Sequence, residues 1–484
     1  MTADKGYDPS GAERFLAPEY WRDRALEDIL PPWIEHSRDL VHGGFHTNLS
    51  RSWERFGSSE RFSAMLGRHV FSFSAAFLLS GEERYRELAR EAFDYLVEHA
   101  WDREFGGWFH SITETGSPRE TSKDAFANMY ANTGCALYHL ATGDTAARRC
   151  VEEANRFFET HADDPEHGGY FKVLDRDGTP RDTGKSFNPQ IGNLSSYLLY
   201  FALATGRDEY VAQMRRAMDL ALLRMRSPTD GYILDHFDRD WTLRPMRRED
   251  GTEVIAVGGN LETVWVLIRL HLLTGADSYR RDALELAGRV LPPSWDDEFG
   301  GWYESFGRGD TSDHGSSKIW FIQAYGNFFD LSLYGLNRDP ACLERFKRNS
   351  AFWERHLLDR EYGGDLFSVD RSGAILDGSK GTYGKASYHS MEHCLLNYLY
   401  LGLYVHERPV ALHYFLDGSA GTGVRLVCPV EDPRVVVASV TEDGRPLPGA
   451  AAGGRTVPVS AGRRSSMRVE FRRSGPRGRP SAHP

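Results

Sequence analysis

The chain has 484 residues, of which 40% are hydrophobic and 26% are charged, enough apolar material for a large core. Its formal net charge of −11 argues against a nucleic-acid partner, because phosphate binding needs a basic surface. No run of 18 apolar residues occurs, so we expect no membrane-spanning helix.

The first residues carry no apolar segment of the kind found in secretory signals. The five cysteines are scattered and never spaced as CxxC. We expect buried thiols in a reducing compartment rather than a zinc site, and therefore a cytoplasmic protein. The cysteines are Cys135, Cys150, Cys342, Cys394 and Cys428.

A glycine motif followed by an aromatic residue recurs along the chain every 62 to 69 residues. Each copy opens a short aromatic and β-branched stretch that ends in a turn signal, which predicts a two-stranded hairpin. Six copies are found, two of them weaker than the others. They are Gly43-Gly44-Phe45, Gly106-Gly107-Trp108, Gly168-Gly169-Tyr170, Gly231-Tyr232, Gly300-Gly301-Trp302 and Gly363-Gly364-Asp365.

Apolar runs follow these hairpins, and four of them end at a glycine, in residues 78–81, 140–143, 203–206 and 272–275. A glycine at that place is typical of a left-handed helix C-cap. The runs are apolar nearly all round, so we expect buried helices. The segments after them are amphipathic, for example Tyr85 to His99 and Tyr210 to Met225, and are expected to form an outer layer.

One unit therefore consists of a hairpin, an inner helix, a glycine cap and an outer helix. A single unit cannot bury its own apolar face, but six units closing in a ring can. The sequence predicts an all-α fold, a six-fold (α/α) barrel over residues 1–406 with the hairpins at one end. A solenoid is the alternative. The barrel is favoured because polar and aromatic residues at the starts of the inner helices would line a shared cavity.

The pattern changes at about Glu407. Short β-branched segments separated by turns predict a small β-rich module over residues 407–471. Its strands are expected at 410–415, 424–428, 434–440, 456–459 and 467–471. Residues 472–484 are rich in arginine, proline and glycine and are predicted to be a disordered tail.

A basic residue recurs between the hairpin and the inner helix, and each copy could bind an anionic or hydroxylated ligand. Repeated units reproduce structural residues as readily as functional ones, so a structural role and a ligand-binding role both stay open for these residues. The residues are Arg61, Lys123, Lys185, Lys318 and Lys385.

His389 begins the sixth inner helix and could exchange a proton near neutral pH. His393 follows on the same helical face, but no carboxylate or cysteine at ligand spacing accompanies the pair, so a metal is not expected. Glu262 lies in the apolar fourth inner helix, where a carboxylate is costly unless it is paired or employed. Asp235-His236 and Asp313-His314 are further candidates.

Residues 20–405 resemble the N-acylglucosamine 2-epimerase and cellobiose 2-epimerase family, which folds as a six-fold α/α barrel. The segments that carry the resemblance are 68–74 (Arg-His-Val-Phe-Ser-Phe-Ser), 123–128 (Lys-Asp-Ala-Phe-Ala-Asn), 236–241 (His-Phe-Asp-Arg-Asp-Trp), 260–265 (Asn-Leu-Glu-Thr-Val-Trp), 318–324 (Lys-Ile-Trp-Phe-Ile-Gln-Ala) and Tyr388-His389.

The resemblance implies an enzyme that interconverts sugars epimeric at C2, or an aldose and a ketose. In the family a base removes the proton α to the carbonyl of the open-chain sugar, and the acid–base groups are typically two histidines. His389 matches one of them. The other lies in a Gly-His-x-x-Glu pattern, which here reads Gly-Gly-Asn-Leu-Glu over 258–262, so that Gly259 stands at the place of the histidine.

The third unit departs from the family pattern as well. The family often has Asn-x-His-x-His in this inner helix, followed by a glutamate. Residues 188–192 read Asn-Pro-Gln-Ile-Gly, with Gln190 at the place of an imidazole and Ser195 near that of the glutamate. The ordinary two-histidine mechanism therefore cannot operate unchanged.

Three functions remain open. The first is a cofactor-independent isomerase with His389 as general base, helped by Glu262, His236 or a water molecule. The second is a barrel enzyme repurposed as a lyase, dehydratase or cyclase on a non-sugar or modified-sugar metabolite of a biosynthetic pathway. The third is a non-catalytic carbohydrate-binding protein. We favour the first, as a monomer or homodimer with a small-molecule substrate and no bound metal.

The residues expected at the site fall into two groups. His389, Glu262 and His236 are expected to be catalytic. Arg68 and Lys318 are expected to bind the oxyanion or hydroxyl groups, and Trp320 and Tyr388 to shape the pocket. The further expected substrate-binding residues are Asn128, Gln190, Asn260 and Gln323.

Overall fold

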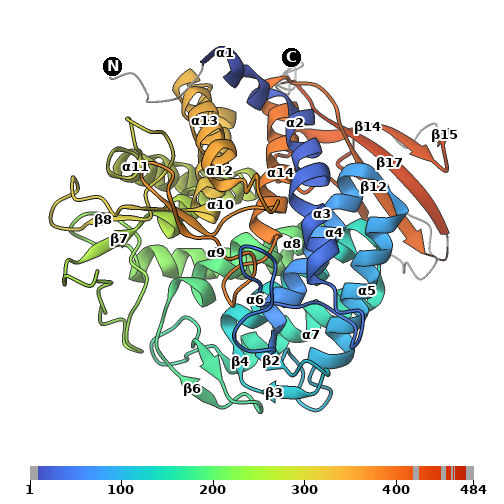
Figure 1. Ribbon diagram of the computed structural model, residues 1–484, viewed down its shortest axis with the longest axis horizontal. Helices are drawn as coiled ribbons and strands as arrows, with labels where there is room; N and C mark the ends of the chain where they lie inside the picture. Colours follow the sequence, from blue (N-terminus) through green and yellow to red (C-terminus); the bar gives the residue numbers. More distant parts are fainter. Residues whose placement is uncertain (1–8, 418–424, 448–453, 459–461, 463, 476–484) are drawn as a thin grey trace, which may run out of the picture.

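Six inner helical segments form a closed ring in the computed structural model, which describes residues 9–417, 425–447, 454–458, 462 and 464–475 (Figure 1). Each segment packs against the next along the chain, and α14 returns to pack against α4. The ring confirms the predicted barrel and excludes the solenoid. The segments are α4 (Ser63–Ser80), α6 (Ala125–Thr142), η3 (Asn188–Gly192) with η4 (Leu194–Leu198) and α8 (Leu199–Thr205), α10 (Val257–Thr274), α12 (Trp320–Asn337), and α14 (Tyr388–Tyr400) with η6 (Leu401–Val405).

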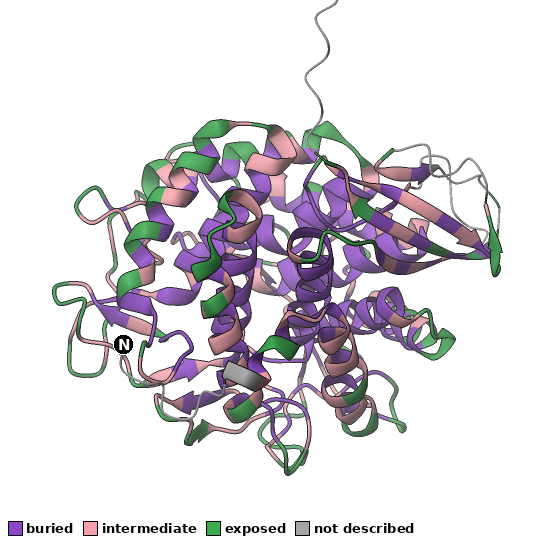
Figure 2. Ribbon diagram, turned by 90° about the horizontal axis from the view of Figure 1, so that it is seen from above, coloured by how far each residue is buried: buried purple, intermediate pink, exposed green. Residues whose placement is uncertain are grey.

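The amphipathic helices form an outer layer around this ring. Figure 2 shows the inner helices buried and the outer helices exposing one face to solvent. None of the helices in the described ranges is long and apolar enough to span a membrane. The outer segments are α2 (Pro18–Asp23) with η2 (Arg24–Ile29) and α3 (Leu30–Ser37), α5 (Glu83–Ala100), α7 (Thr145–His161), α9 (Asp208–Arg224), α11 (Asp277–Ser294), and α13 (Pro340–Phe352) with η5 (Trp353–Leu357); α1 (Pro9–Ala12) and η1 (Glu13–Leu16) precede them.

The predicted glycine caps end four of the inner helices. Gly81, Gly143, Gly206 and Gly275 have φ of 72°, 70°, 66° and 73°, and each donates its N–H to a carbonyl of the last helical turn. Only glycine adopts this conformation without steric cost. The fifth inner helix differs, because the C-cap of α12 is Arg338, with φ 60°.

The hairpins lie at the end of the barrel where the inner helices begin. The strand that leads into one inner helix pairs with the hairpin of the following unit, as β1 pairs with β2, so neighbouring units are joined by backbone hydrogen bonds. The strands are β1 (Arg61–Phe62), β2 (Ser111–Ile112), β3 (Pro118–Glu120), β4 (Lys123–Asp124), β5 (Val173–Leu174), β6 (Pro180–Asp182), β7 (Val254–Ala256), β8 (Ser305–Gly307), β9 (Ser317–Ile319), β10 (Ser368–Asp370) and β11 (Ile375–Asp377).

The strands after the barrel, here called the C-terminal module, pack at the opposite end. An antiparallel sheet has the order β12-β17-β14-β15, and β13 pairs with β16. β12 packs on α4 and α6, and β13 packs on α6 and α8. The five expected strand segments overlap β12, β13, β14, β16 and β17, and residues 424 and 459 of these segments lie outside the described residues. The bounds are β12 (Val410–Asp417), β13 (Arg425–Val427), β14 (Val435–Glu442), β15 (Arg445–Pro446), β16 (Thr456–Pro458) and β17 (Arg464–Arg473).

β17 continues two residues beyond the expected end of the module at 471. Its residues 464–471 alternate between exposed or partly exposed and buried, as in a strand with one covered face. Most of the predicted tail, residues 476–484, lies outside the described residues. The five cysteines are buried and unpaired, as expected.

Candidate active site

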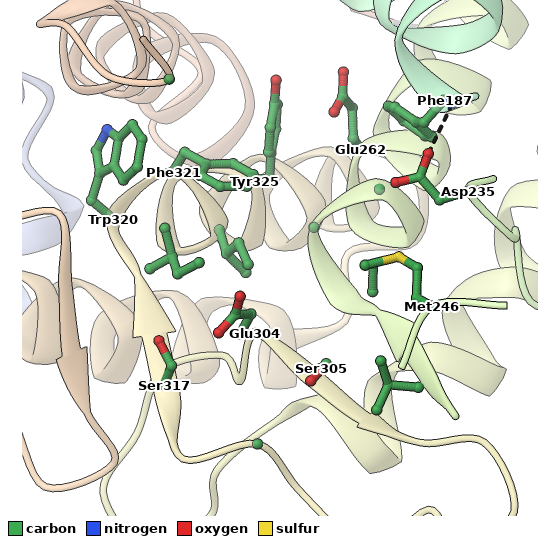
Figure 3. Close-up of a pocket in the computed structure, with 18 of the residues that line it drawn as sticks. Phe187, Asp235, Met246, Glu262, Glu304, Ser305, Ser317, Trp320, Phe321 and Tyr325 are labelled. Carbon is green, nitrogen blue, oxygen red and sulfur yellow. Dashed lines mark hydrogen bonds between the residues drawn. The ribbon is translucent and has the colours of Figure 1, made fainter. Parts of the chain in front are cut away.

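A cavity of about 730 Å³ lies at the hairpin end of the barrel, between the first turns of the inner helices. Loops of the fourth and fifth units complete its wall (Figure 3). Both charged and aromatic side chains line it, which suits a polar ligand with flat faces. The polar lining includes Arg68, Tyr130, Asp235, Glu262, Glu304, Tyr325 and His389, and the aromatic lining includes Phe126, Phe187, Trp320, Phe321 and Phe367.

His389 lies in the first turn of α14 and is 4% exposed. Its Nε2 is 3.4 Å from the hydroxyl oxygen of Tyr130. The Phe321 ring is centred 5.4 Å away and the Trp320 ring 5.8 Å away. Burial lowers the pKa of His389 well below its usual value, and the charge of Arg68 lowers it further. The imidazole is therefore neutral at neutral pH, the form that accepts a proton.

Arg68 projects from α4 beside this histidine. Its guanidinium lies 3.7 Å from the centre of the Tyr130 ring, a cation–π contact. It also donates to the carbonyl of Gly384, in the loop before α14, at 2.6 Å. Both contacts fix a positive group at the cavity wall, next to the Tyr130 hydroxyl. A cation held in a buried wall is well placed to stabilise an oxyanion.

Glu262 enters the same cavity from α10 and is 7% exposed. The hydroxyl of Ser195 donates to its carboxylate, and Figure 3 shows Tyr325 projecting alongside it. Burial raises the pKa of Glu262 to about 8; the hydrogen bond from Ser195 opposes the shift and the charge of Glu392 adds to it. The carboxyl group is therefore protonated near neutral pH and can donate a proton.

The four amides expected to bind substrate are structural instead. Each bonds both the N–H and the carbonyl of the residue two positions after the first glycine of a glycine motif, and none of the four lines the cavity. An amide supplies the donor and the acceptor that such a clamp needs. We therefore assign them to the barrel wall. The pairs are Asn128 with Trp108, Gln190 with Tyr170, Asn260 with Ile233 and Gln323 with Trp302.

The recurring lysines are also structural. Lys318 is fully buried, and its ammonium group lies 2.9 Å from the carboxylate of Asp296. Asp296 is the first residue of the turn that contains Gly300-Gly301. The ammonium does not line the cavity, so the expected substrate contact is replaced by an ion pair that fixes the turn to the inner helix. The same pairing recurs between Lys123 and Asp102, Lys185 and Asp164, and Arg61 and Asp39.

The remaining expected residues divide between the cavity and the wall behind it. Trp320 lines the cavity. Tyr388 is buried outside the lining, and its hydroxyl donates to Glu392 at 2.9 Å. His236 is exposed on the hairpin, 3.5 Å from Asp235. It is Asp235 that lines the cavity, where it accepts a hydrogen bond from the N–H of Phe187 at 2.9 Å.

His393 belongs to the core. Its Nε2 lies 2.8 Å from the side-chain nitrogen of Asn327, and its ring packs between Trp21 and Trp353. Because an amide N–H donates here, Nε2 acts as the acceptor. This histidine is not placed to share a metal with His389.

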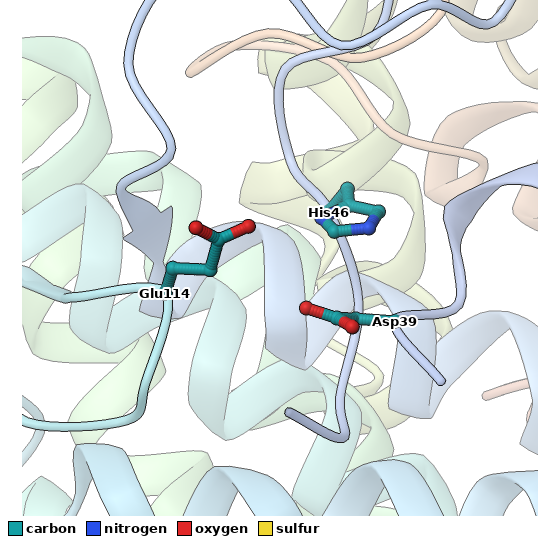
Figure 4. A group of neighbouring side chains, drawn as sticks. All are labelled: Asp39, His46 and Glu114. Carbon is teal, nitrogen blue, oxygen red and sulfur yellow. The ribbon is translucent and has the colours of Figure 1, made fainter. Parts of the chain in front are cut away.

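A carboxylate–histidine cluster of Asp39, His46 and Glu114 lies at the first hairpin (Figure 4). Asp39 already accepts hydrogen bonds from two backbone N–H groups of its own turn and from Arg61. Glu114 is paired with Arg55. Since these contacts already use the carboxylates, we assign no metal to the cluster.

The sequence also contains a signal for cavity residues, at a fixed distance from the wall amides. In three of the four units with a wall amide, the residue two positions after the amide lines the cavity: Tyr130 follows Asn128, Glu262 follows Asn260, and Tyr325 follows Gln323. Counting from the wall amides would have identified Tyr130 and Tyr325. That count does not find Phe187, which begins the third inner helix, or Glu304, which directly precedes β8.

Comparisons with known proteins identify the family and agree with the fold. The family model of N-acylglucosamine 2-epimerase matches residues 43–393. The chain belongs to this family. The cellobiose 2-epimerase of Bacteroides fragilis is 24% identical over 380 residues, covering 76% of this chain and 95% of that protein. The D-mannose isomerase of Marinomonas mediterranea is 21% identical over 370 residues, covering 73% and 90%.

A solved relative shares the barrel. The structure of cellobiose 2-epimerase from Spirochaeta thermophila superposes with a TM-score of 0.70 and 24% identity, covering 81% of this chain and 98% of that chain. At this identity the superposition establishes the fold, and the chemistry must be argued from the side chains.

The departure from the family pattern at Gly259 has a structural counterpart. A Cβ atom at this position would lie 3.2 Å from the ring of Phe187, closer than an ordinary van der Waals contact. Phe187 therefore takes the space that a histidine side chain would need. In this family member an aromatic wall stands where the resemblance implies a second imidazole.

Proposed function

We propose that the protein is a cofactor-independent sugar isomerase that acts by proton transfer α to the carbonyl of an open-chain sugar. One observation supports this most directly: a neutral imidazole, His389, and a carboxyl group that is protonated near neutral pH, Glu262, line the same cavity. Such a pair can take a proton from carbon and give one to oxygen at the same pH.

In the first step His389 removes the proton from the carbon next to the carbonyl. The electron pair of that bond forms the C=C bond of an enediol, and Glu262 gives its proton to the carbonyl oxygen. Arg68 and the hydroxyl of Tyr130 stabilise the negative charge that develops on oxygen, because both are fixed donors in a buried wall.

In the second step the roles reverse. His389 returns its proton to the carbon that was the carbonyl carbon, and the carboxylate of Glu262 takes the proton from the neighbouring hydroxyl. The product is the ketose of the original aldose, and both groups regain their starting protonation states. No net proton is gained or lost.

We favour an aldose–ketose reaction over inversion at C2. Inversion needs a proton donor on each face of the enediol, and Gly259 supplies no group that titrates. A single base can move a proton from C2 to C1 on one face. The family relationship to a D-mannose isomerase is consistent with this choice.

The experiment is incubation of the protein with mannose, glucose, cellobiose and N-acetylmannosamine in D₂O, followed by NMR. We expect a ketose product with deuterium at C1, or recovered aldose with deuterium at C2, from at least one sugar. Absence of exchange with every sugar would refute the proposed proton transfer on these substrates and favour a repurposed or non-catalytic barrel.

A further inference from the structure

A buried arginine lies below the cavity. Arg269 is 1% exposed and follows Glu262 by two helical turns on α10. Its guanidinium lies 4.4 Å from the ring of Trp265 and 5.3 Å from that of Tyr200. Its Nη2 bonds Glu431 at 2.5 Å, and across the described residues its Nε and Nη1 have no hydrogen-bond partner. Glu431 is therefore the group that compensates this charge.

Glu431 does not belong to the barrel. It lies between β13 and β14 of the C-terminal module, is 1% exposed, and is outside the residues 43–393 that match the family model. The module thus inserts a carboxylate under the inner helices.

One line of contacts leads from this ion pair to the base. The hydroxyl of Tyr200 donates to Glu392 at 2.7 Å, and the hydroxyl of Tyr388 donates to the same oxygen at 2.9 Å. The ring of Tyr388 packs edge-on against Tyr130 at 5.3 Å and against His389 at 4.7 Å. Tyr130 and His389 are the two side chains that contact each other at the cavity wall.

A second line leads to the acid. The ring of Trp265 is centred 5.8 Å from that of Tyr325, and its N–H donates to the hydroxyl of Tyr400 at 3.0 Å. Tyr325 projects beside Glu262 in Figure 3 and lies 5.7 Å from the ring of His389. Both lines start at rings under the guanidinium of Arg269.

We propose that Glu431 is a positioning residue for the proton-transfer pair, acting through Arg269 and the two rings it packs on. The C-terminal module is then part of the active site's support rather than an appended unit. This inference rests on the proposed function for its kinetic test and on the contacts alone for its spectroscopic one.

The physical reason is the cost of a lone buried charge. Removing one partner of a buried ion pair leaves the other uncompensated, and the remaining group moves or admits water. If the guanidinium of Arg269 moves, the rings of Tyr200 and Trp265 lose the contact that holds them in place. Displacements of about 1 Å at reacting groups cost about 100-fold in rate.

The test compares Glu431→Gln with Asp432→Asn. Asp432 is an equally buried neighbour in the module, but its carboxylate bonds Arg434 and Arg473 and not Arg269. We expect Glu431→Gln to lower kcat by about 10- to 100-fold with KM within about twofold, because substrate contacts remain. Glu431→Asp should recover part of kcat, and Asp432→Asn should keep it.

A second readout needs no substrate. With ¹⁵N-labelled histidine, the imidazole signal of His389, assigned by its loss in His389→Gln, should shift in Glu431→Gln and stay unchanged in Asp432→Asn. If Glu431→Gln does not fold, Arg269→Met/Glu431→Met replaces the pair by apolar side chains, and the same shift is expected.

Equal losses of thermal stability in Glu431→Gln and Asp432→Asn, with kcat and the His389 signal unchanged in both, would overturn the proposal and leave the module a purely structural role. If the wild-type protein turns over no sugar, the proposed function fails, while the histidine signal still decides the positioning role.

Discussion

The hydroxyl of Tyr130, on α6, lies 3.4 Å from Nε2 of His389, in the first turn of α14. The same tyrosine ring carries the guanidinium of Arg68 on its face. One side chain thus links the proposed base to the proposed oxyanion-stabilising group. Because Arg68 and His389 both also contact the Tyr130 ring, the hydroxyl can be removed while these ring contacts remain.

Tyr130→Phe is expected to lower kcat by about 10- to 100-fold, because a fixed donor at the developing oxyanion is lost while the packing of Arg68 is kept. Steady-state kinetics on the sugar that shows exchange will measure this. Tyr138→Phe is the matched control on the same helix, since its ring packs on Phe93 in the outer layer. A Tyr130→Phe enzyme as active as the control would exclude the hydroxyl from the mechanism.

Activity should fall as pH rises through about 8. Glu262 must be protonated to donate to the carbonyl oxygen, and burial raises its pKa from 4.5 to about 8. In Glu262→Gln this fall should vanish together with most of kcat. A pH–rate profile of kcat in both proteins checks it, and an unchanged fall in the variant would assign the ionisation to another group.

The same shift predicts how stability depends on pH. The folded protein keeps the Glu262 proton up to about pH 8, whereas an unfolded glutamate releases it near 4.5. The contribution of this carboxyl group to the free energy of unfolding is therefore most favourable below pH 4.5, and it decreases as pH rises from 4.5 to about 8. Thermal unfolding of Glu262→Gln between pH 5 and 8 should show a smaller fall in Tm than the wild type; an equal fall would contradict the raised pKa.

The sequence predicted the barrel well because its signals are local and repeated. Glycine motifs and glycine caps need particular backbone conformations, so they mark hairpins and helix ends wherever they occur. The same repetition misled the choice of site residues. The ion pair of Lys318 and the amide clamp of Gln323 have counterparts in several other units, where they hold a hairpin to an inner helix.

Cavity residues, by contrast, differ from unit to unit. Tyr130, Glu262 and Tyr325 occupy one register position, which holds a carboxyl group in one unit and a phenol in the other two, and Gly259 shares the register position of His389. Phe187 is brought to Gly259 by tertiary packing, which a single sequence does not show.

A clamp residue should affect stability and not chemistry. Gln323→Ala removes hydrogen bonds to Trp302 from a buried site, which should cost about 1–3 kcal/mol of unfolding free energy. At temperatures where the variant is folded, KM and kcat should match the wild type. Denaturant unfolding and kinetics measured together test this, and a selective rise in KM would return Gln323 to the substrate site.

A histidine at position 259 should fit only if the Phe187 ring is made smaller. Gly259→His alone should destabilise the fold by about 1–3 kcal/mol, because its side chain meets the ring of Phe187. Gly259→His with Phe187→Ala should lose less stability and gain C2 epimer relative to ketose. Product ratios by NMR and thermal unfolding check both expectations, and a single variant as stable as the wild type would contradict the steric argument.

The most direct test of the proposed function is the rate of deuterium uptake from D₂O into substrate by His389→Gln and His236→Gln. Both histidines are candidates from sequence, but only His389 lines the cavity, whereas His236 is exposed on the hairpin. We predict that His389→Gln lowers the rate by about 10²- to 10⁴-fold and that His236→Gln leaves it unchanged. Uptake that persists in His389→Gln, or is lost in His236→Gln, would contradict the assignment of His389 as the base.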